Sequence, residues 1–238
     1  MATKKVVLFD LDNTLYEYEP VHQKALKSVY NILKKEIKIS LKEFLKLYKY
    51  SKAEIHRELA GTASSHNRVL YFQRLIEKTH NTIEPDVVLK LYGAYWDSFL
   101  KNMKLRKGVI QTLKKLKQLD IKTAIISDLT TIIQLKKMSK LGITQYIDIL
   151  VTSEEAGSEK PNNVMFLLAL NKLNVLPSDA VMVGDNPIND IEGGNSVGLD
   201  TILITDKKST KFKFREDYQK PNYTIKEIPE ILDLLQIK

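Results

Sequence analysis

The stretch VVLFDLDNT, at residues 6–14, is the part of the sequence that best indicates the fold. Its first half is a short apolar run rich in β-branched residues, which is typical of a buried strand, and the run stops at Asp10. We expect four further buried strands from comparable apolar runs later in the chain, at residues 123–126, 149–152, 180–183 and 201–204. The first of these five strands runs directly into an acidic loop.

Amphipathic segments lie between the later runs, with apolar residues three and four positions apart, which predicts helices. They cover residues 109–119, 132–141, 163–173 and 188–197. Strands that alternate with helices indicate an α/β fold, in which a parallel sheet has helices on both faces.

One long block, from about Pro20 to Met103, shows helical periodicity only. Its predicted helices span residues 21–35, 41–59, 67–79 and 85–101. The apolar faces of these helices suit a small bundle. We therefore expect an all-helical domain at residues 18–104, inserted into an α/β core made of residues 1–17 and 105–238.

The composition is that of a globular protein: 238 residues, of which 43% are hydrophobic and 28% charged. Because the chain has no cysteine, disulfides, thiolate metal sites and cysteine nucleophiles are excluded. The longest apolar stretch, residues 164–170, is far too short to cross a bilayer. No apolar signal region follows Lys4 and Lys5. We expect a cytoplasmic protein without a membrane partner.

The formal net charge of +8 raises nucleic acid as a possible partner. However, only five of the 37 basic residues are arginine, the better phosphate reader, and the lysines interleave with acids along the whole chain. This pattern is typical of solvated helix faces. We therefore expect no nucleic-acid partner.

Polar residues capable of chemistry stand just after four of the predicted strands, where ligands collect in open parallel sheets. They are Asp10 and Asp12 after the first run, Ser127 and Asp128 after the second, Lys160 after the third, and Asp185 and Asp190 after the fourth. Each residue alone is an ordinary turn or helix-capping residue. Carboxylates that converge on one rim need a divalent cation or a basic partner, and Mg²⁺ prefers such oxygen ligands.

Taken together, these motifs resemble those of the haloacid dehalogenase superfamily of Mg²⁺-dependent phosphotransferases. The matching positions are FDLDNT at residues 9–14, Ser127, Lys160, and GDNPIND at residues 184–190. The resemblance covers residues 6–204 and implies a Rossmann-like core with an inserted helical cap. The VMVGD segment at 181–185, together with His66-Asn67-Arg68, is most similar to the N-acylneuraminate-9-phosphatase group and its archaeal relatives.

The resemblance implies a role for each motif residue. Asp10 is expected to attack phosphorus, and Asp12 to serve first as the general acid and then as the general base. Ser127 and Lys160 are expected to bind the phosphate oxygens.

The same resemblance assigns Mg²⁺ to the carboxylates of Asp10 and Asp185 and to the backbone carbonyl of Asp12. Asp190 is expected to orient Lys160 or metal-bound water, and Thr14 to orient Asp12. The predicted partner is a small phosphorylated metabolite, and the protein is expected to be a monomer or a homodimer.

Two alternatives to a phosphatase remain open on the sequence alone. A sugar phosphomutase would keep all the motif residues, and a non-catalytic sensor of phosphorylated ligands could use the same scaffold. Against the sensor, Asp10, Asp12 and Lys160 are all present.

Two glycines, Gly193 and Gly194, fall within a predicted helix and indicate close packing or a helix end rather than a dinucleotide site.

The inserted helical block contains one further candidate region. A loop of small polar residues at 61–65 precedes His66 and Arg68, at the predicted start of a helix. Arg68 could clamp a carboxylate or hydroxyl groups of the substrate through its forked donors. The alternative is that Arg68 pairs with a glutamate of the same block and that His66 only caps the helix.

Overall fold

The computed structural model describes residues 4–205 and 216–235. The polar, lysine-rich stretch at residues 205–220, for which the sequence predicts a surface loop, lies mostly outside these ranges. The chain divides into two compact units, residues 1–17 with 104–238, and residues 18–103. No helix among the described residues has both the length and the apolar character needed to span a membrane.

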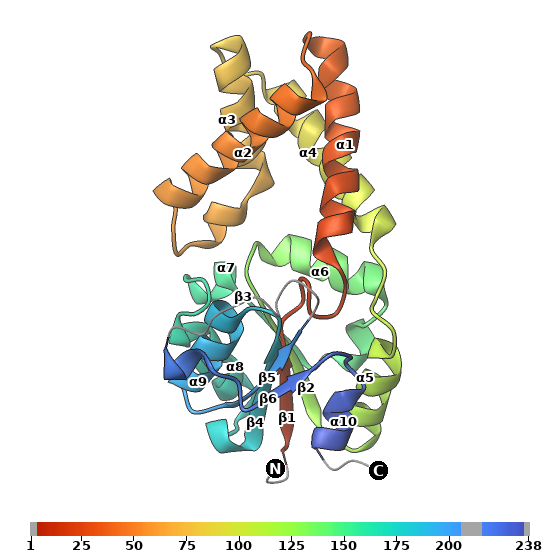
Figure 1. The fold of residues 1–238 in the computed structure, drawn as a ribbon, viewed down its shortest axis with the longest axis vertical. Coiled ribbons are helices and arrows are strands. Elements are labelled where there is room, and N and C mark those ends of the chain that lie inside the picture. The colour runs from red at the N-terminus through yellow and green to blue at the C-terminus, as the bar shows by residue number, and fades with distance from the viewer. Residues whose placement is uncertain (1–3, 206–215, 236–238) are drawn as a thin grey trace. The chain divides into compact units, whose positions relative to one another are not determined.

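The first unit is built on a six-stranded sheet in the order β3-β2-β1-β4-β5-β6, with every neighbouring pair parallel (Figure 1). This arrangement confirms the predicted parallel α/β fold. The strands are β1 (Val6–Phe9), β2 (Lys122–Ser127), β3 (Ile149–Thr152), β4 (Ala180–Gly184), β5 (Asp200–Ile204) and β6 (Tyr223–Ile225). Because β1 lies between β2 and β4, the loop after β1 is flanked by the ends of both neighbours.

Helices cover both faces of this sheet, with α8 and α9 on one side and α5 and α10 on the other (Figure 1). A buried cluster on the first side joins alternate residues of the central strands, such as Leu8 and Ile126, to Met165 and Phe166 of α8. The helices of this unit are α5 (Val109–Gln118), α6 (Thr131–Leu141), α7 (Ser153–Ala156), α8 (Asn163–Leu173), α9 (Gly193–Ser196) and α10 (Glu230–Leu234).

The expected helix at residues 188–197 takes a different form. Residues Pro187–Glu192 form a π-helical turn, in which the amide of Ile191 donates to the carbonyl of Asn186, and α9 follows it. The wider turn occurs where Gly193 packs against the ring of Phe166, at a distance that leaves no room for a Cβ. The prediction that this glycine is a close-packing residue is therefore confirmed. π-turns of this kind are frequent at functional sites.

The second unit, residues 18–103, is entirely helical. Its helices are α1 (Tyr18–Glu36), α2 (Leu41–Glu58), α3 (Arg68–His80) and α4 (Pro85–Asn102), with a short 3₁₀ turn at Ala63–His66. Local sequence sets the starts of the helices: Ser40 and Glu43 form a capping box at α2, and Pro85 is the first residue of α4. Aromatic rings fill the interior of this bundle.

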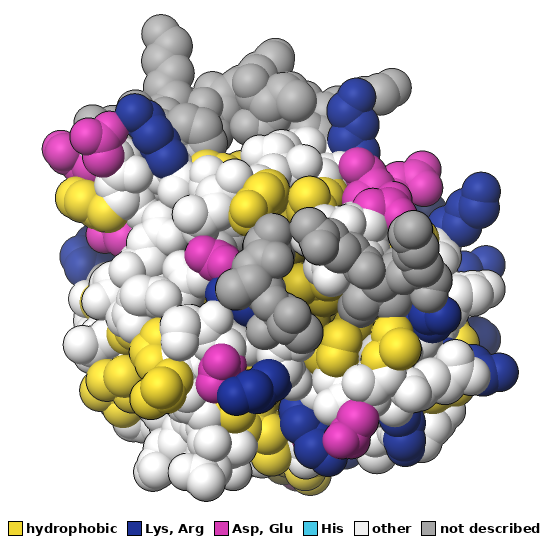
Figure 2. Space-filling view, turned by 90° about the horizontal axis from the view of Figure 1, so that it is seen from below, with side chains coloured by type: hydrophobic (Ala, Val, Ile, Leu, Met, Phe, Trp, Pro, Cys, Tyr) yellow, Lys and Arg dark blue, Asp and Glu magenta, His cyan; other side chains and the backbone are white. Residues whose placement is uncertain are grey.

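On the surface seen in Figure 2, lysine and arginine side chains are scattered, and several have acidic side chains beside them. This arrangement is that of a mixed, solvated surface.

Candidate active site

Asp10 stands at the carboxyl end of β1 and is almost fully buried, with 6% of its surface exposed. Its two carboxylate oxygens have different partners: Oδ1 accepts a hydrogen bond from Lys160 Nζ at 2.7 Å, and Oδ2 accepts one from the Thr14 hydroxyl at 2.9 Å. The loop can turn back in this way because Asn13 takes a left-handed conformation, with φ of 67°, which asparagine tolerates. Thr14 therefore orients Asp10, whereas the sequence led us to expect Asp12.

Lys160 is the buried cation that contacts Asp10. Besides Asp10, its ammonium contacts Asp190 Oδ1 at 2.6 Å, and the other oxygen of Asp190 accepts from the Asn186 amide at 3.0 Å. Burial acts to lower the pKa of Lys160, but Asp10 and Asp190 outweigh it and hold the pKa above its ordinary value. The lysine therefore stays charged.

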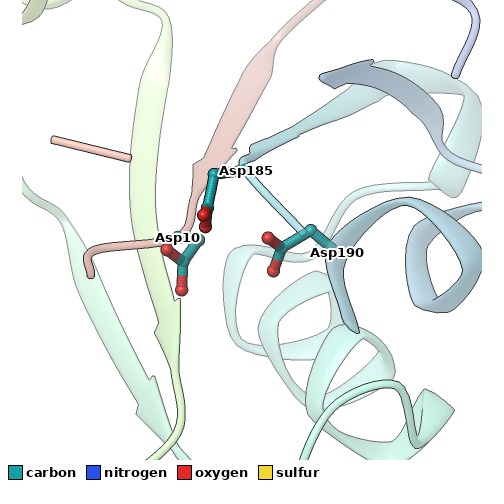
Figure 3. Close-up of side chains that lie close together, drawn as sticks. All are labelled: Asp10, Asp185 and Asp190. Carbon is teal, nitrogen blue, oxygen red and sulfur yellow. The ribbon is translucent and has the colours of Figure 1, made fainter. Parts of the chain in front are cut away.

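Three carboxylates converge beside this lysine. Asp10, Asp185 and Asp190 each place one oxygen within 4.8 Å of the others, and Figure 3 shows the three groups facing one another. Burial, reinforced by the charge of Asp190, raises the pKa of Asp185 to about 7. Burial likewise raises the pKa of Asp10, against the opposing effect of Lys160.

When all three carboxylates are ionised, the cluster carries more negative charge than the single ammonium of Lys160 compensates. A divalent cation with oxygen ligands would relieve this repulsion, so the donor set fits Mg²⁺. Asp10 and Asp185 are among the predicted metal ligands. The side chain of Asp12 does not belong to the cluster.

Ser127 is the last residue of β2 and is 1% exposed. Its Oγ accepts a hydrogen bond from Gln134 Nε2 at 2.7 Å, and the same amide group donates to the Asp128 carbonyl. The carboxylate of Asp128 in turn accepts from the backbone amide of Lys160 at 3.0 Å. The segments after β2 and β3 are thus tied together, which brings Ser127 and Lys160 to the same edge of the sheet.

Asp12 is held by two residues that the sequence analysis missed. Lys137 Nζ lies 2.7 Å from both of its carboxylate oxygens, and the Tyr16 hydroxyl donates to Oδ1 at 2.5 Å. One signal for Lys137 is present in the sequence, since this residue falls on the apolar stripe of α6 between Ile133 and Leu141. A lysine at such a position must bury its charge against a partner.

The two candidates in the helical unit have surroundings of their own. Arg68 is 7% exposed, and its guanidinium donates to the His66 carbonyl and to the Tyr18 hydroxyl. It forms no ion pair with a carboxylate anywhere in the described ranges, so the expected glutamate partner is absent there. The ring of His66 packs edge-on against the ring of His56, and Asn67 rather than His66 caps α3.

Comparison with known proteins gives a consistent picture. Residues 7–204 match the family model described as haloacid dehalogenase-like hydrolase. The ribulose-1,5-bisphosphate 5-phosphatase of Halopiger xanaduensis is 44% identical over 86% of this chain and 85% of its own length. The glyceraldehyde 3-phosphate phosphatase of Methanopyrus kandleri is 32% identical over 98% of this chain and 97% of its own length.

The finer resemblance is also confirmed, because the N-acylneuraminate-9-phosphatase of Homo sapiens is 26% identical over 99% of this chain and 95% of its own length. Among solved structures, a haloacid dehalogenase phosphatase from Thermococcus onnurineus matches with a TM-score of 0.74 at 25% identity, over 97% of each chain. The parallel sheet, the residues at its strand ends and these relatives lead to one conclusion: the chain belongs to the haloacid dehalogenase-like hydrolase family.

Proposed function

We propose that the protein is a Mg²⁺-dependent phosphatase that hydrolyses a small sugar phosphate or sugar-acid phosphate through an aspartyl-phosphate on Asp10. One observation carries the proposal: a buried aspartate at the end of β1 contacts a buried lysine, Lys160, within a cluster of three carboxylates. The relatives named above are phosphatases of ribulose bisphosphate and glyceraldehyde phosphate, which supports the class of reaction and of substrate.

The surroundings of Asp10 suit a nucleophile. Thr14 and Lys160 hold its two oxygens, so the carboxylate is oriented before the substrate arrives. Asp10 attacks phosphorus, a bond forms between its oxygen and phosphorus, and the bond from phosphorus to the ester oxygen breaks. Asp10, Asp185 and the Asp12 backbone carbonyl would hold Mg²⁺, which would neutralise negative charge on the transferred group.

Two residues bind the nonbridging phosphate oxygens. Ser127 Oγ accepts from Gln134, which leaves the serine hydrogen available for donation to the phosphate. Lys160 provides a positive charge, and Asp190 keeps it in place.

Asp12 transfers the protons. Its side chain is 29% exposed, unlike that of Asp10, so it can reach both an ester oxygen and water. Asp12 first protonates the leaving alkoxide and then takes a proton from the water that attacks the aspartyl-phosphate. That second attack releases inorganic phosphate and restores Asp10.

The helical unit, residues 18–103, is proposed to act as the cap that selects the substrate, with Arg68 and His66 contacting its far end. The support is electrostatic: Arg68 is buried without a carboxylate partner in the part of the chain that the structure describes. Buried charges are normally paired, and an anionic group on the substrate would supply the missing partner. Arg68→Gln and His66→Ala should lower kcat/KM for a sugar-acid phosphate or a bisphosphate more than for 4-nitrophenyl phosphate. Equal effects on both kinds of ester would refute the contact.

The test of the proposed function is a panel of sugar phosphates and sugar-acid phosphates, assayed for phosphate release with Mg²⁺ and with EDTA. We expect release of inorganic phosphate that EDTA abolishes and Mg²⁺ restores. An isomeric phosphate ester as the product would identify a mutase instead. Binding without turnover of any ester would identify a sensor.

A further inference from the structure

Lys137 is the most deeply buried charged residue of α6. Its side chain has no exposed surface, and its ammonium is 2.7 Å from each oxygen of Asp12, a residue 125 positions away in the chain. Burial of a lysine in the protein interior is costly unless the charge is paired and hydrogen-bonded. The carboxylate of Asp12 provides that pairing, which places a strong geometric requirement on both side chains.

Tyr16 restricts the same carboxylate from a second direction. Its ring is fully buried, and its hydroxyl donates to Asp12 Oδ1 at 2.5 Å. The backbone of Tyr16 forms isolated bridges with Asp12 and with Leu105, so the tyrosine is fixed at both ends. Two rigid donors, one on α6 and one on the loop after β1, therefore hold Asp12 in a single orientation.

The two lysines of the site have separate partners. Lys160 contacts Asp10 and Asp190, within the carboxylate cluster, whereas Lys137 contacts Asp12, whose side chain lies outside that cluster. The printed contact of Lys137 thus falls on Asp12, the residue proposed to transfer protons.

We propose that Lys137, together with Tyr16, is a positioning residue that fixes the Asp12 carboxyl group, which gives its proton to the ester oxygen of the leaving group as the phosphorus–oxygen bond breaks. The inference rests on the proposed function, because it assigns Lys137 a part in that reaction. Alkyl esters, such as sugar phosphates, depend on this proton because an alkoxide is a poor leaving group. An aryl ester such as 4-nitrophenyl phosphate depends on it little, because its leaving group is stable as an anion.

The experiment compares kcat/KM for two esters: 4-nitrophenyl phosphate and the alkyl phosphate that the wild type hydrolyses fastest in the panel. A well-placed general acid contributes roughly 10²- to 10⁴-fold, so a displaced one should lose at least about tenfold. We expect Lys137→Met to lower the alkyl-to-aryl ratio of kcat/KM by about tenfold or more. This ratio cancels any uniform loss caused by partial unfolding.

Lys136→Met is the matched control, because Lys136 is exposed and its substitution removes the same charge from the same helix. It should leave the ratio unchanged. Tyr16→Phe keeps the buried ring and should lower the ratio in the same direction, so the inference stays testable even where Lys137→Met does not fold.

Equal losses on both esters in Lys137→Met and Tyr16→Phe, or an equal fall of the ratio in Lys136→Met, would overturn the inference while leaving the phosphatase in place. A folded wild type that hydrolyses neither ester would overturn the proposed function, and this inference with it.

Discussion

Replacement of Lys160 by methionine tests the electrostatics of the site. In the wild type, its ammonium is 2.7 Å from Asp10 and 2.6 Å from Asp190, and all three side chains are buried. Methionine fills a similar volume but leaves both carboxylates without their cation. Breaking a buried ion pair in this way costs about 3 to 5 kcal/mol of unfolding free energy. For a chain of this size, that corresponds to a melting temperature about 6 to 20 °C lower.

The assay is thermal melting in EDTA at pH 8 and pH 5, with Lys136→Met as the control for loss of one lysine. At pH 8 we expect Lys160→Met to show the full deficit. At pH 5 the deficit should shrink, because burial raises the pKa of Asp10 and the opposing effect of Lys160 is gone, so the Asp10 carboxylate can take up a proton. A deficit below about 1 kcal/mol at pH 8, or one that does not change between the two pH values, would show that Lys160 does not compensate the charge of the two carboxylates.

The remaining predictions concern other parts of the two units. Because the pKa of Asp185 is raised to about 7, the folded protein without metal binds an extra proton there between about pH 4 and 7, and Mg²⁺ must displace that proton. The rise in melting temperature on adding Mg²⁺ should therefore grow from pH 5 to 7.5 and then level off. A rise that is the same at every pH would contradict this. Burial lowers the pKa of His22 to about 3, so the contribution of neutral His22 to the free energy of unfolding is complete above pH 6.5 and is lost as pH falls. Between neutral pH and pH 4.5, the free energy of unfolding measured in urea should fall by about 3 kcal/mol more in the wild type than in His22→Gln. Parallel pH profiles of the two proteins would exclude this. A Cβ on Gly184 would lie 2.2 Å from Asp190 Oδ2, so Gly184→Ala should cost about 1 to 3 kcal/mol and most of the phosphatase activity, whereas Gly93→Ala, which meets nothing within 4 Å, should leave activity unchanged.

The parallel sheet could be predicted from the sequence because its strands are buried on both faces and therefore appear as continuous apolar runs. The positions of the strand ends could be predicted from the same apolar runs, and they place Asp10, Ser127 and Lys160 at one edge of the sheet. The position of β1 between β2 and β4 then accounts for their convergence.

The supporting contacts could not be predicted in the same way. The place of Lys137 on the apolar stripe of α6 indicates that it is buried, but only the packing of α6 shows that Lys137 contacts Asp12 and that Gln134 contacts Ser127. Periodicity gives the faces of a helix, but it does not give the partner of a side chain, whether that partner is 7 residues away, as Ser127 is from Gln134, or 125, as Asp12 is from Lys137. Similarly, the choice of Thr14 between Asp10 and Asp12 depends on the left-handed turn at Asn13.

The π-turn at residues 187–192 and the burial of Arg68 were missed for related reasons. The hydrogen bonds of a π-turn span five residues instead of the four of an α-helix, and the apolar spacing of the segment does not distinguish the two. Arginine is mostly exposed in proteins, so its sequence position at the start of α3 favoured a surface residue. In the structure, Tyr71, Tyr95 and Trp96 surround it.

The central claim is that Asp10 attacks phosphorus in a Mg²⁺-dependent phosphatase. The most direct measurement is rapid quenching of the enzyme during turnover of a ³²P-labelled sugar phosphate, followed by peptide mapping of the labelled protein. We expect an acyl phosphate on Asp10 that forms with Mg²⁺, is absent in EDTA, and is lost in Asp10→Asn together with phosphate release. Turnover at even about a tenth of the wild-type rate in Asp10→Asn, a barrier change of only about 1.4 kcal/mol, or a label on another residue, would contradict it.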